Sequence, residues 1–148
     1  MGYMAQAYGT ICIKGDEKII KMIKNYITRV LYGDVNEEDS FTNEYTKISF
    51  SAPRESAMVN YHREQYLGLY KLAGKSCVKG IVRFNGFDGR YSFWCHSYNK
   101  DTGKWSEHEG RIVYSGLNIA EGEDFLNGGY EELKLPRVSR AMRQSLAQ

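Results

Sequence analysis

The stretch from Cys77 to Tyr114 constrains the fold of this chain more than any other. Three runs rich in β-branched and aromatic residues, CVKGIVRF, RYSFWCHSY and WSEHEGRIVY, are separated by short segments that contain Asn-Gly, Asp-Gly and Thr-Gly. Glycine at such positions adopts the positive φ that tight hairpins require. The pattern predicts an antiparallel meander of three strands.

Strand and helix patterns precede this meander. Tyr3–Ile13 and Tyr45–Ser51 alternate apolar and polar residues, as half-buried strands do. Between them, apolar residues recur at helical spacing after Asp16, a suitable N-cap, and Gly33 follows as a stop signal. The acidic segment Asp34–Asn43 is interpreted as a solvated connecting loop.

A second helix is predicted for Arg54–Ala73, where apolar residues form one helical stripe before Gly74. Gly68 in its interior costs about 1 kcal/mol relative to alanine. A short strand at Ala57–Tyr61 followed by a shorter helix is therefore the alternative. After Tyr114 the composition shifts to Gly, Asn, Glu and Asp, which indicates a structured loop with one helical turn.

The order strand, helix, strand, helix and three strands predicts the α+β class. We expect a mainly antiparallel sheet with a C-terminal three-stranded meander and two helices packed on one face, a two-layer sandwich. Residues 1–135 would form a single domain. Residues 136–148 would form a basic C-terminal tail, because four cations and no acid occur from Lys134 to Gln148. The tail would be disordered when free and helical only against another surface.

Composition and motifs argue against several classes of protein. The formal net charge of 148 residues is only +2, so charge alone dictates no partner. Three cysteines without a CxxC pair argue against a disulfide framework or a zinc ribbon and predict reduced, buried thiols. No cofactor is expected, since the motifs GxGxxG and GxxxxGK[ST] are absent. No metal is expected either, since the two histidines that a bulged second hairpin would bring together, His96 and His108, have no evident third ligand. No apolar run approaches about twenty residues, so we expect a soluble protein of the bacterial cytoplasm with no membrane partner.

The register of the two hairpins decides which face of the meander is buried. A four-residue loop in the first hairpin places Phe84 opposite Gly89 and makes room above Gly80 for the ring of Phe93. The core face then holds Val78, Val82, Phe84, Tyr91, Phe93 and Cys95. In the second hairpin, a bulge at Gly103 would bury Glu107, Glu109 and Arg111, which is costly, so the register without a bulge is preferred.

The outer face would then carry basic and aromatic side chains on adjacent strands, and the tail would add an arginine at every third position. Arg, Trp and Tyr are enriched at protein-binding hot spots. Basic and aromatic residues on a sheet also stack bases and hold phosphates. A cover made by residues 120–135 or by a second copy of the chain is a third interpretation. The candidate partner-binding residues are Lys79, Arg83, Arg90, Trp94, His96, Tyr98, Trp105, Arg111, Arg137, Arg140 and Arg143.

The Lys-, Asn-, Tyr- and Ile-rich, Pro-poor composition resembles that of small proteins of low-GC bacteria and their phages, including anti-defence inhibitors. No catalytic constellation is evident. The sequence thus predicts a small non-enzymatic binding protein that docks on a protein or protein–nucleic acid complex, as a phage or mobile-element accessory or inhibitor protein. The alternative is a module that binds nucleic acid or nucleotides directly. A third class is an enzyme whose site the sequence does not reveal.

Overall fold

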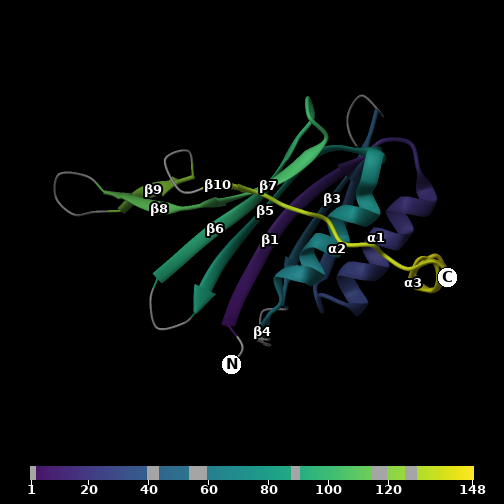
Figure 1. The fold of residues 1–148 in the computed structure, drawn as a ribbon, viewed down its shortest axis with the longest axis horizontal. Coiled ribbons are helices and arrows are strands. Elements are labelled where there is room, and N and C mark those ends of the chain that lie inside the picture. The colour runs from purple at the N-terminus through teal and green to yellow at the C-terminus, as the bar shows by residue number, and fades with distance from the viewer. Residues whose placement is uncertain (1–2, 40–43, 54–59, 88–90, 115–119, 126–129) are drawn as a thin grey trace.

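The structure, a computed structural model, describes residues 3–39, 44–53, 60–87, 91–114, 120–125 and 130–148. Its centre is an antiparallel sheet with the strand order β10-β7-β6-β5-β1-β3-β2, in which short β4 pairs with the start of β1 (Figure 1). Strands β8 and β9 form a separate two-stranded sheet. The strands are β1 (Tyr3–Ile13), β2 (Asp34–Asp39), β3 (Thr46–Ala52), β4 (Asn60–Tyr61), β5 (Cys77–Phe87), β6 (Tyr91–Asn99), β7 (Lys104–Glu109), β8 (Arg111–Tyr114), β9 (Ala120–Asp124) and β10 (Tyr130–Glu132).

Helices α1 (Glu17–Arg29) and α2 (Arg63–Ala73) cover one face of this sheet, and α3 (Arg140–Leu146) lies against α1 (Figure 1). A 3-10 turn at Gly74–Ser76 leads from α2 into β5. Asp16 caps α1 as predicted, because its Oδ1 accepts a hydrogen bond from the Ile19 amide at 3.1 Å. The α+β class, with both predicted helices on one face, is confirmed.

The core lies between the sheet and these two helices. Odd-numbered residues of β1, such as Ile11 and Ile13, face the helices and are buried, whereas Tyr8 on the other face is exposed. The glycine at position 68 is explained by this packing. A Cβ atom there would lie 2.5 Å from the hydroxyl of Tyr26 on α1. Gly68 therefore allows α1 and α2 to pack closely, and this packing offsets the destabilising effect of a glycine inside a helix.

Several predicted elements differ from the structure. The segment predicted as an acidic loop contains edge strand β2, which pairs with β3. The alternative of a short strand followed by a shorter helix is correct, since β4 precedes helix α2, which begins only at Arg63. Residues 54–59 lie outside the described residues. The third strand of the meander ends at Glu109, and β8 leaves the main sheet to pair with β9. The segment after Tyr114 contains strands β9 and β10 in its described part.

The predicted register of the first hairpin is wrong. The structure pairs Val82 with His96 and Phe87 with Tyr91, so Phe93 and Cys95 lie on the face away from the helices. The odd change in register moves every β6 side chain to the opposite face. Full-length pairing of β5 with β1, which includes Asn85 and Gly86 in the ladder, outweighs the local Asn-Gly turn signal.

The preferred register of the second hairpin is confirmed. Asn99 pairs with Lys104 and Tyr98 with Trp105, which leaves a four-residue loop without a bulge. Inside the loop Gly103 has a φ of 71°, and its amide donates to the Asn99 carbonyl at 2.8 Å. The Asn99 side chain accepts a further hydrogen bond from the Asp101 amide at 2.9 Å. The register without a bulge therefore both satisfies the hydrogen bonds of the turn and buries Trp105.

Candidate functional site

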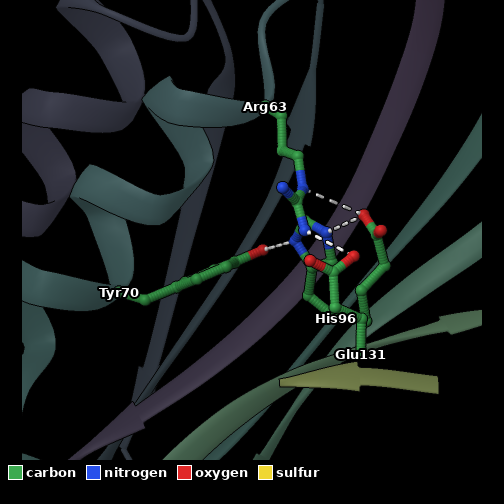
Figure 2. A network of polar contacts seen from close by, with 5 residues as sticks. Arg63, Tyr70, His96 and Glu131 are labelled. Atoms are coloured by element: carbon green, nitrogen blue, oxygen red, sulfur yellow. Dashed lines mark hydrogen bonds and ion pairs between the residues drawn. The ribbon is translucent and has the colours of Figure 1, made fainter. Parts of the chain in front are cut away.

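A chain of polar contacts crosses the core between α2 and the β6–β7 hairpin (Figure 2). His96, with no exposed surface, has its Nδ1 atom 2.5 Å from the Tyr70 hydroxyl and its Nε2 atom 2.8 Å from Glu107 Oε1. Arg63 then lies between two carboxylates: its Nε atom is 3.5 Å from Glu107 Oε1, and its Nη2 atom is 3.2 Å from Glu131 Oε2. Five polar side chains thus connect the buried core to the surface.

The partners of His96 assign its tautomer. A carboxylate only accepts hydrogen bonds, so Nε2–H donates to Glu107, and Nδ1 accepts from the Tyr70 hydroxyl. Burial lowers the pKa of His96, although the bond to Glu107 acts in the opposite direction. The hydrogen bond from His96 lowers the pKa of Glu107 despite its partial burial. At neutral pH the arrangement is therefore a neutral imidazole that holds an ionised carboxylate.

A pocket opens at the outer end of this chain of contacts, beside the start of α2. Its volume is about 530 Å³, and aromatic rings and carboxylates share its lining. The rings of Tyr61 and Trp94 meet edge to face with centroids 5.2 Å apart. We call it the aromatic–carboxylate pocket; its lining residues are Tyr61, Arg63, Phe93, Trp94, Glu107, Glu109 and Gly110.

The opposite face of the sheet exposes a different set of side chains. Tyr8 and Arg83 are directly opposite each other on β1 and β5, and Ile81 is opposite Thr10. Tyr8 is 46% exposed and Ile81 is 38% exposed, while Arg83 is also exposed. We call this side, away from α1 and α2, the outer face. It presents apolar, aromatic and cationic groups together.

One end of the outer face is hollowed and positively charged. A pocket of about 760 Å³ has four lysines and one glutamate in its lining. Lys79 lies over the ring of Tyr45, with 5.5 Å between Nζ and the ring centroid, a distance at which a cation and a ring attract. We call it the lysine pocket; its charged residues are Lys14, Glu44, Lys47, Lys79 and Lys100.

The structure separates the predicted partner-binding residues into different places. Lys79 and Arg83 lie on the outer face, as expected. The prediction that Trp94, His96, Tyr98 and Trp105 face outward is wrong, since these four residues face the helices. Trp105 is only 2% exposed and stacks on Tyr70 with centroids 3.9 Å apart. Arg90 lies outside the described residues. Arg111 lies in β8, and the structure describes only its backbone.

The C-terminal segment docks on the protein's own helix instead of standing apart. Leu146 is 3% exposed and belongs to the core, and the Asn25 side-chain amide donates to its carbonyl at 2.6 Å. This contact differs from the expectation of a free tail. Arg137 and Arg140 remain exposed, whereas Arg143 is partly buried. Arg140 and Arg143 line a hollow together with Lys18 of α1, so these two arginines lie on the helical side of the molecule.

Sequence reasoning missed the aromatic–carboxylate pocket. The expected exposure of Glu107 and Glu109 on the outer face is wrong, since both lie on the same face as Trp105, and no sequence motif links them to Arg63. The signal that could have found it is the pairing of His96 with Glu107 in the correctly predicted second hairpin. A histidine opposite a carboxylate at the buried end of a hairpin indicates a polar network. The start of α2 then supplies Arg63 and Tyr61.

Within the part of the chain that the structure describes, no group of three or more His, Cys, Asp or Glu residues could hold a metal ion. The helices in that part are all too short or too polar to cross a membrane. Comparison with known proteins gave no significant match to a family model, to a curated protein or to a solved structure.

Proposed function

We propose that this protein is a non-enzymatic binding protein that docks through its outer face on an acidic surface of a protein, either free or within a protein–nucleic acid complex. The observation that supports this proposal is the composition of the outer face. The lysine pocket lies at one end, next to exposed Tyr8, Ile81 and Arg83. Exposed apolar groups beside charge of one sign are typical of a surface that recognises a partner.

A protein partner fits this surface better than bare nucleic acid. The outer face includes exposed Met4, Tyr8 and Ile81, which would bury apolar area against a protein. The whole chain has a net charge of only +2, and Glu44 lies among the lysines. A surface specialised for phosphate backbones concentrates more positive charge. A protein partner needs only a few acidic side chains to match the lysine pocket, fewer charges than a phosphate backbone presents.

Binding without chemistry also agrees with the polar network. Burial raises the pKa of Tyr70 well above 10, so its hydroxyl keeps its proton and donates to His96. Glu107 is a carboxylate of lowered pKa, which makes it a weak base. The network therefore supports positioning more than proton transfer. A protein that binds and blocks or recruits a partner acts as an inhibitor or accessory factor, and we propose that role in a bacterial cytoplasm.

The experiment that tests the proposal compares charge variants on the two sides of the sheet. The immobilised full chain would be incubated with a nuclease-treated lysate of a bacterial host, and retained proteins identified by mass spectrometry. Reversal of the outer-face charges in Lys79→Glu/Arg83→Glu should abolish capture of a specific protein. The matched control, Lys18→Glu/Lys21→Glu, makes the same charge change at exposed positions of α1 and should leave capture intact.

Two results would contradict the proposal. One is equal capture by the outer-face variant and the unaltered protein, and the other is a loss in the α1 variant alone. Circular dichroism of each variant would show that the fold is retained. A captured protein should also leave the column as salt rises, because charges at the rim of an interface are screened.

Direct nucleic-acid binding is the second candidate, favoured by the Tyr45 ring beside Lys79 in the lysine pocket. Fluorescence anisotropy with an oligothymidylate of about 20 nucleotides would test it. Because contacts to phosphates weaken with added salt, the affinity should fall steeply as salt rises from about 50 to about 200 mM. Such binding, with a protein captured only when the lysate is left untreated by nuclease, would replace the protein partner by nucleic acid.

A further inference from the structure

The described residues of the aromatic–carboxylate pocket have a negative balance of charge. Glu107 and Glu109 line it, and Glu131 lies at its edge through the contact with Arg63. Arg63 is the one cation among its described lining residues, and two of the three carboxylates already pair with it. His96 behind Glu107 is neutral. The pocket therefore favours a cationic ligand over an anionic one.

Glu107 is fixed in position before any ligand arrives. His96 and Arg63 both contact its Oε1 atom, at 2.8 Å and 3.5 Å, so within the described structure Oε2 is left for a ligand. The side chain of Glu107 is 23% exposed, which shows that it reaches the surface of the pocket. A preorganised carboxylate loses little side-chain entropy on binding, and this raises affinity.

Aromatic rings complete the site beside the second carboxylate. Trp94 and Glu109 are directly opposite each other on β6 and β7, so ring and carboxylate emerge on the same face. The ring of Trp94 packs on Phe84 with centroids 5.3 Å apart and an interplanar angle of 7°, which fixes its plane. A flat cation can stack on such a ring while it bonds to the neighbouring carboxylate.

We propose that the aromatic–carboxylate pocket binds the guanidinium group of an arginine side chain presented by a peptide or protein. The guanidinium is planar, weakly hydrated and able to donate two parallel hydrogen bonds to one carboxylate, whereas an ammonium is a compact, strongly hydrated charge. The volume of about 530 Å³ accommodates the aliphatic stem and neighbouring backbone as well as the guanidinium itself.

This site is independent of the proposed docking by the outer face. The pocket lies beside the start of α2, on the side of the sheet that the helices cover, whereas the lysine pocket lies on the outer face. The two surfaces also have opposite charge. A partner could engage both, but neither proposal needs the other.

Isothermal titration calorimetry with three blocked tripeptides tests the proposal. The probes are acetyl-Gly-Arg-Gly-amide, its lysine counterpart and its citrulline counterpart, in which a neutral urea replaces the guanidinium. The arginine peptide should bind saturably and more tightly than the lysine peptide, and the citrulline peptide should not bind. Glu109→Gln should weaken binding of the arginine peptide at least tenfold, about 1.4 kcal/mol.

The matched control is Glu132→Gln, which removes the same charge from an exposed position of β10 that pairs with Lys104. It should bind the arginine peptide as the unaltered protein does. Tryptophan fluorescence gives a second readout, because Trp105 is buried and Trp94 lines the pocket. The arginine peptide should change the emission of the unaltered protein, and the change should be lost in Trp94→Phe.

Three results would overturn the proposal. Equal binding of the arginine and citrulline peptides would show that charge is not recognised. Equal weakening by Glu109→Gln and Glu132→Gln would show a general effect of net charge. Absence of both heat and fluorescence change would show that the pocket takes no arginine side chain. Each of these results leaves capture through the outer face unaffected, so the two proposals fail separately.

Discussion

His96 Nε2 lies 2.8 Å from Glu107 Oε1, and this contact joins the closed core to the aromatic–carboxylate pocket. The two residues are direct partners on β6 and β7. His96 is completely buried, whereas the side chain of Glu107 is partly exposed. A buried imidazole of this kind is stable only when both nitrogens are bonded, and Tyr70 satisfies the second nitrogen.

Stability should fall as pH falls below neutrality, because burial lowers the pKa of His96. An unfolded chain binds a proton at its histidine below about pH 6.5, while folded His96 stays neutral to lower pH. The stabilisation is therefore present above that pKa and is lost as pH falls through the lower pKa of the folded state. Urea unfolding between about pH 7.5 and 5.5 would measure it.

The control for this pH dependence is His96→Gln, which keeps a polar side chain but does not titrate. Its free energy of unfolding should be lower at neutral pH and should change less over the same range. Glu107 also has a lowered pKa, through the hydrogen bond from His96, but its loss of stability belongs to more acidic solutions. If the free energy of unfolding of His96→Gln changed with pH as steeply as that of the unaltered protein, the pH dependence would belong to other groups.

Gly80→Ala should destabilise the fold by about 1 to 3 kcal/mol, the usual cost of overpacking. A Cβ at this position would lie 2.3 Å from Cη2 of Trp105, whose ring is held on its far side by the stack with Tyr70. Chemical denaturation would measure the loss. Ile81→Ala, on the outer face one residue later and 38% exposed, is the control and should cost far less. Similar losses in both would mean that the ring can move aside.

How much the sequence could predict is illustrated by the same glycine. The expectation that Gly80 makes room for a ring is correct, but the ring belongs to Trp105 and not to Phe93. The register of the second hairpin was predictable from the cost of burying charged residues, although the local turn residues favoured a bulge at Gly103. The first was not, since Asn85-Gly86 is a turn signal in sequence but pairs with β1 and β6 in the structure. Long-range pairing decides such cases.

The error in the first hairpin also misplaced the site. Sequence logic buries Phe93 before His96, because an unpaired buried imidazole is costly. The structure buries both, on opposite faces. Phe93 meets Phe125 edge to face with centroids 5.4 Å apart, while His96 is bonded to Tyr70 and Glu107. These partners lie on segments far apart in the chain, so residue spacing within β6 does not reveal them.

All three cysteines should react slowly with a thiol reagent in the folded protein. Cys12, Cys77 and Cys95 are free and buried. Burial raises the pKa of Cys77 to about 12, so little of the reactive thiolate forms at neutral pH. Mass spectrometry after labelling at neutral pH would follow the reaction, with urea-unfolded protein as the control. Fast labelling of the folded protein, or a disulfide, would contradict this prediction.

Leu146→Ala should release α3 from α1 and lower the free energy of unfolding by about 2 kcal/mol, the low end of the cost of a buried Leu→Ala substitution. The cost is limited to the docking free energy of the segment, because undocking leaves the rest of the core in place. Besides burial of Leu146, Arg29 donates to the Ser145 carbonyl at 3.2 Å. Met142→Ala is the control, since that side chain is 41% exposed on the same helix. Hydrogen exchange at residues 141–146 should accelerate only in Leu146→Ala.

The same variants separate the structural role of the C-terminal segment from recognition. If residues 137–148 formed a free tail that binds the partner, their deletion would leave the fold unchanged and would weaken partner binding at least tenfold, about 1.4 kcal/mol. The docked Leu146 now predicts a loss of stability as well. Arg137→Ala/Arg140→Ala removes exposed charge but keeps this contact. If this variant captures less of the partner than the unaltered protein while its stability is unchanged, the arginines take part in recognition. Unchanged capture would leave the segment with the single role of closing one side of α1.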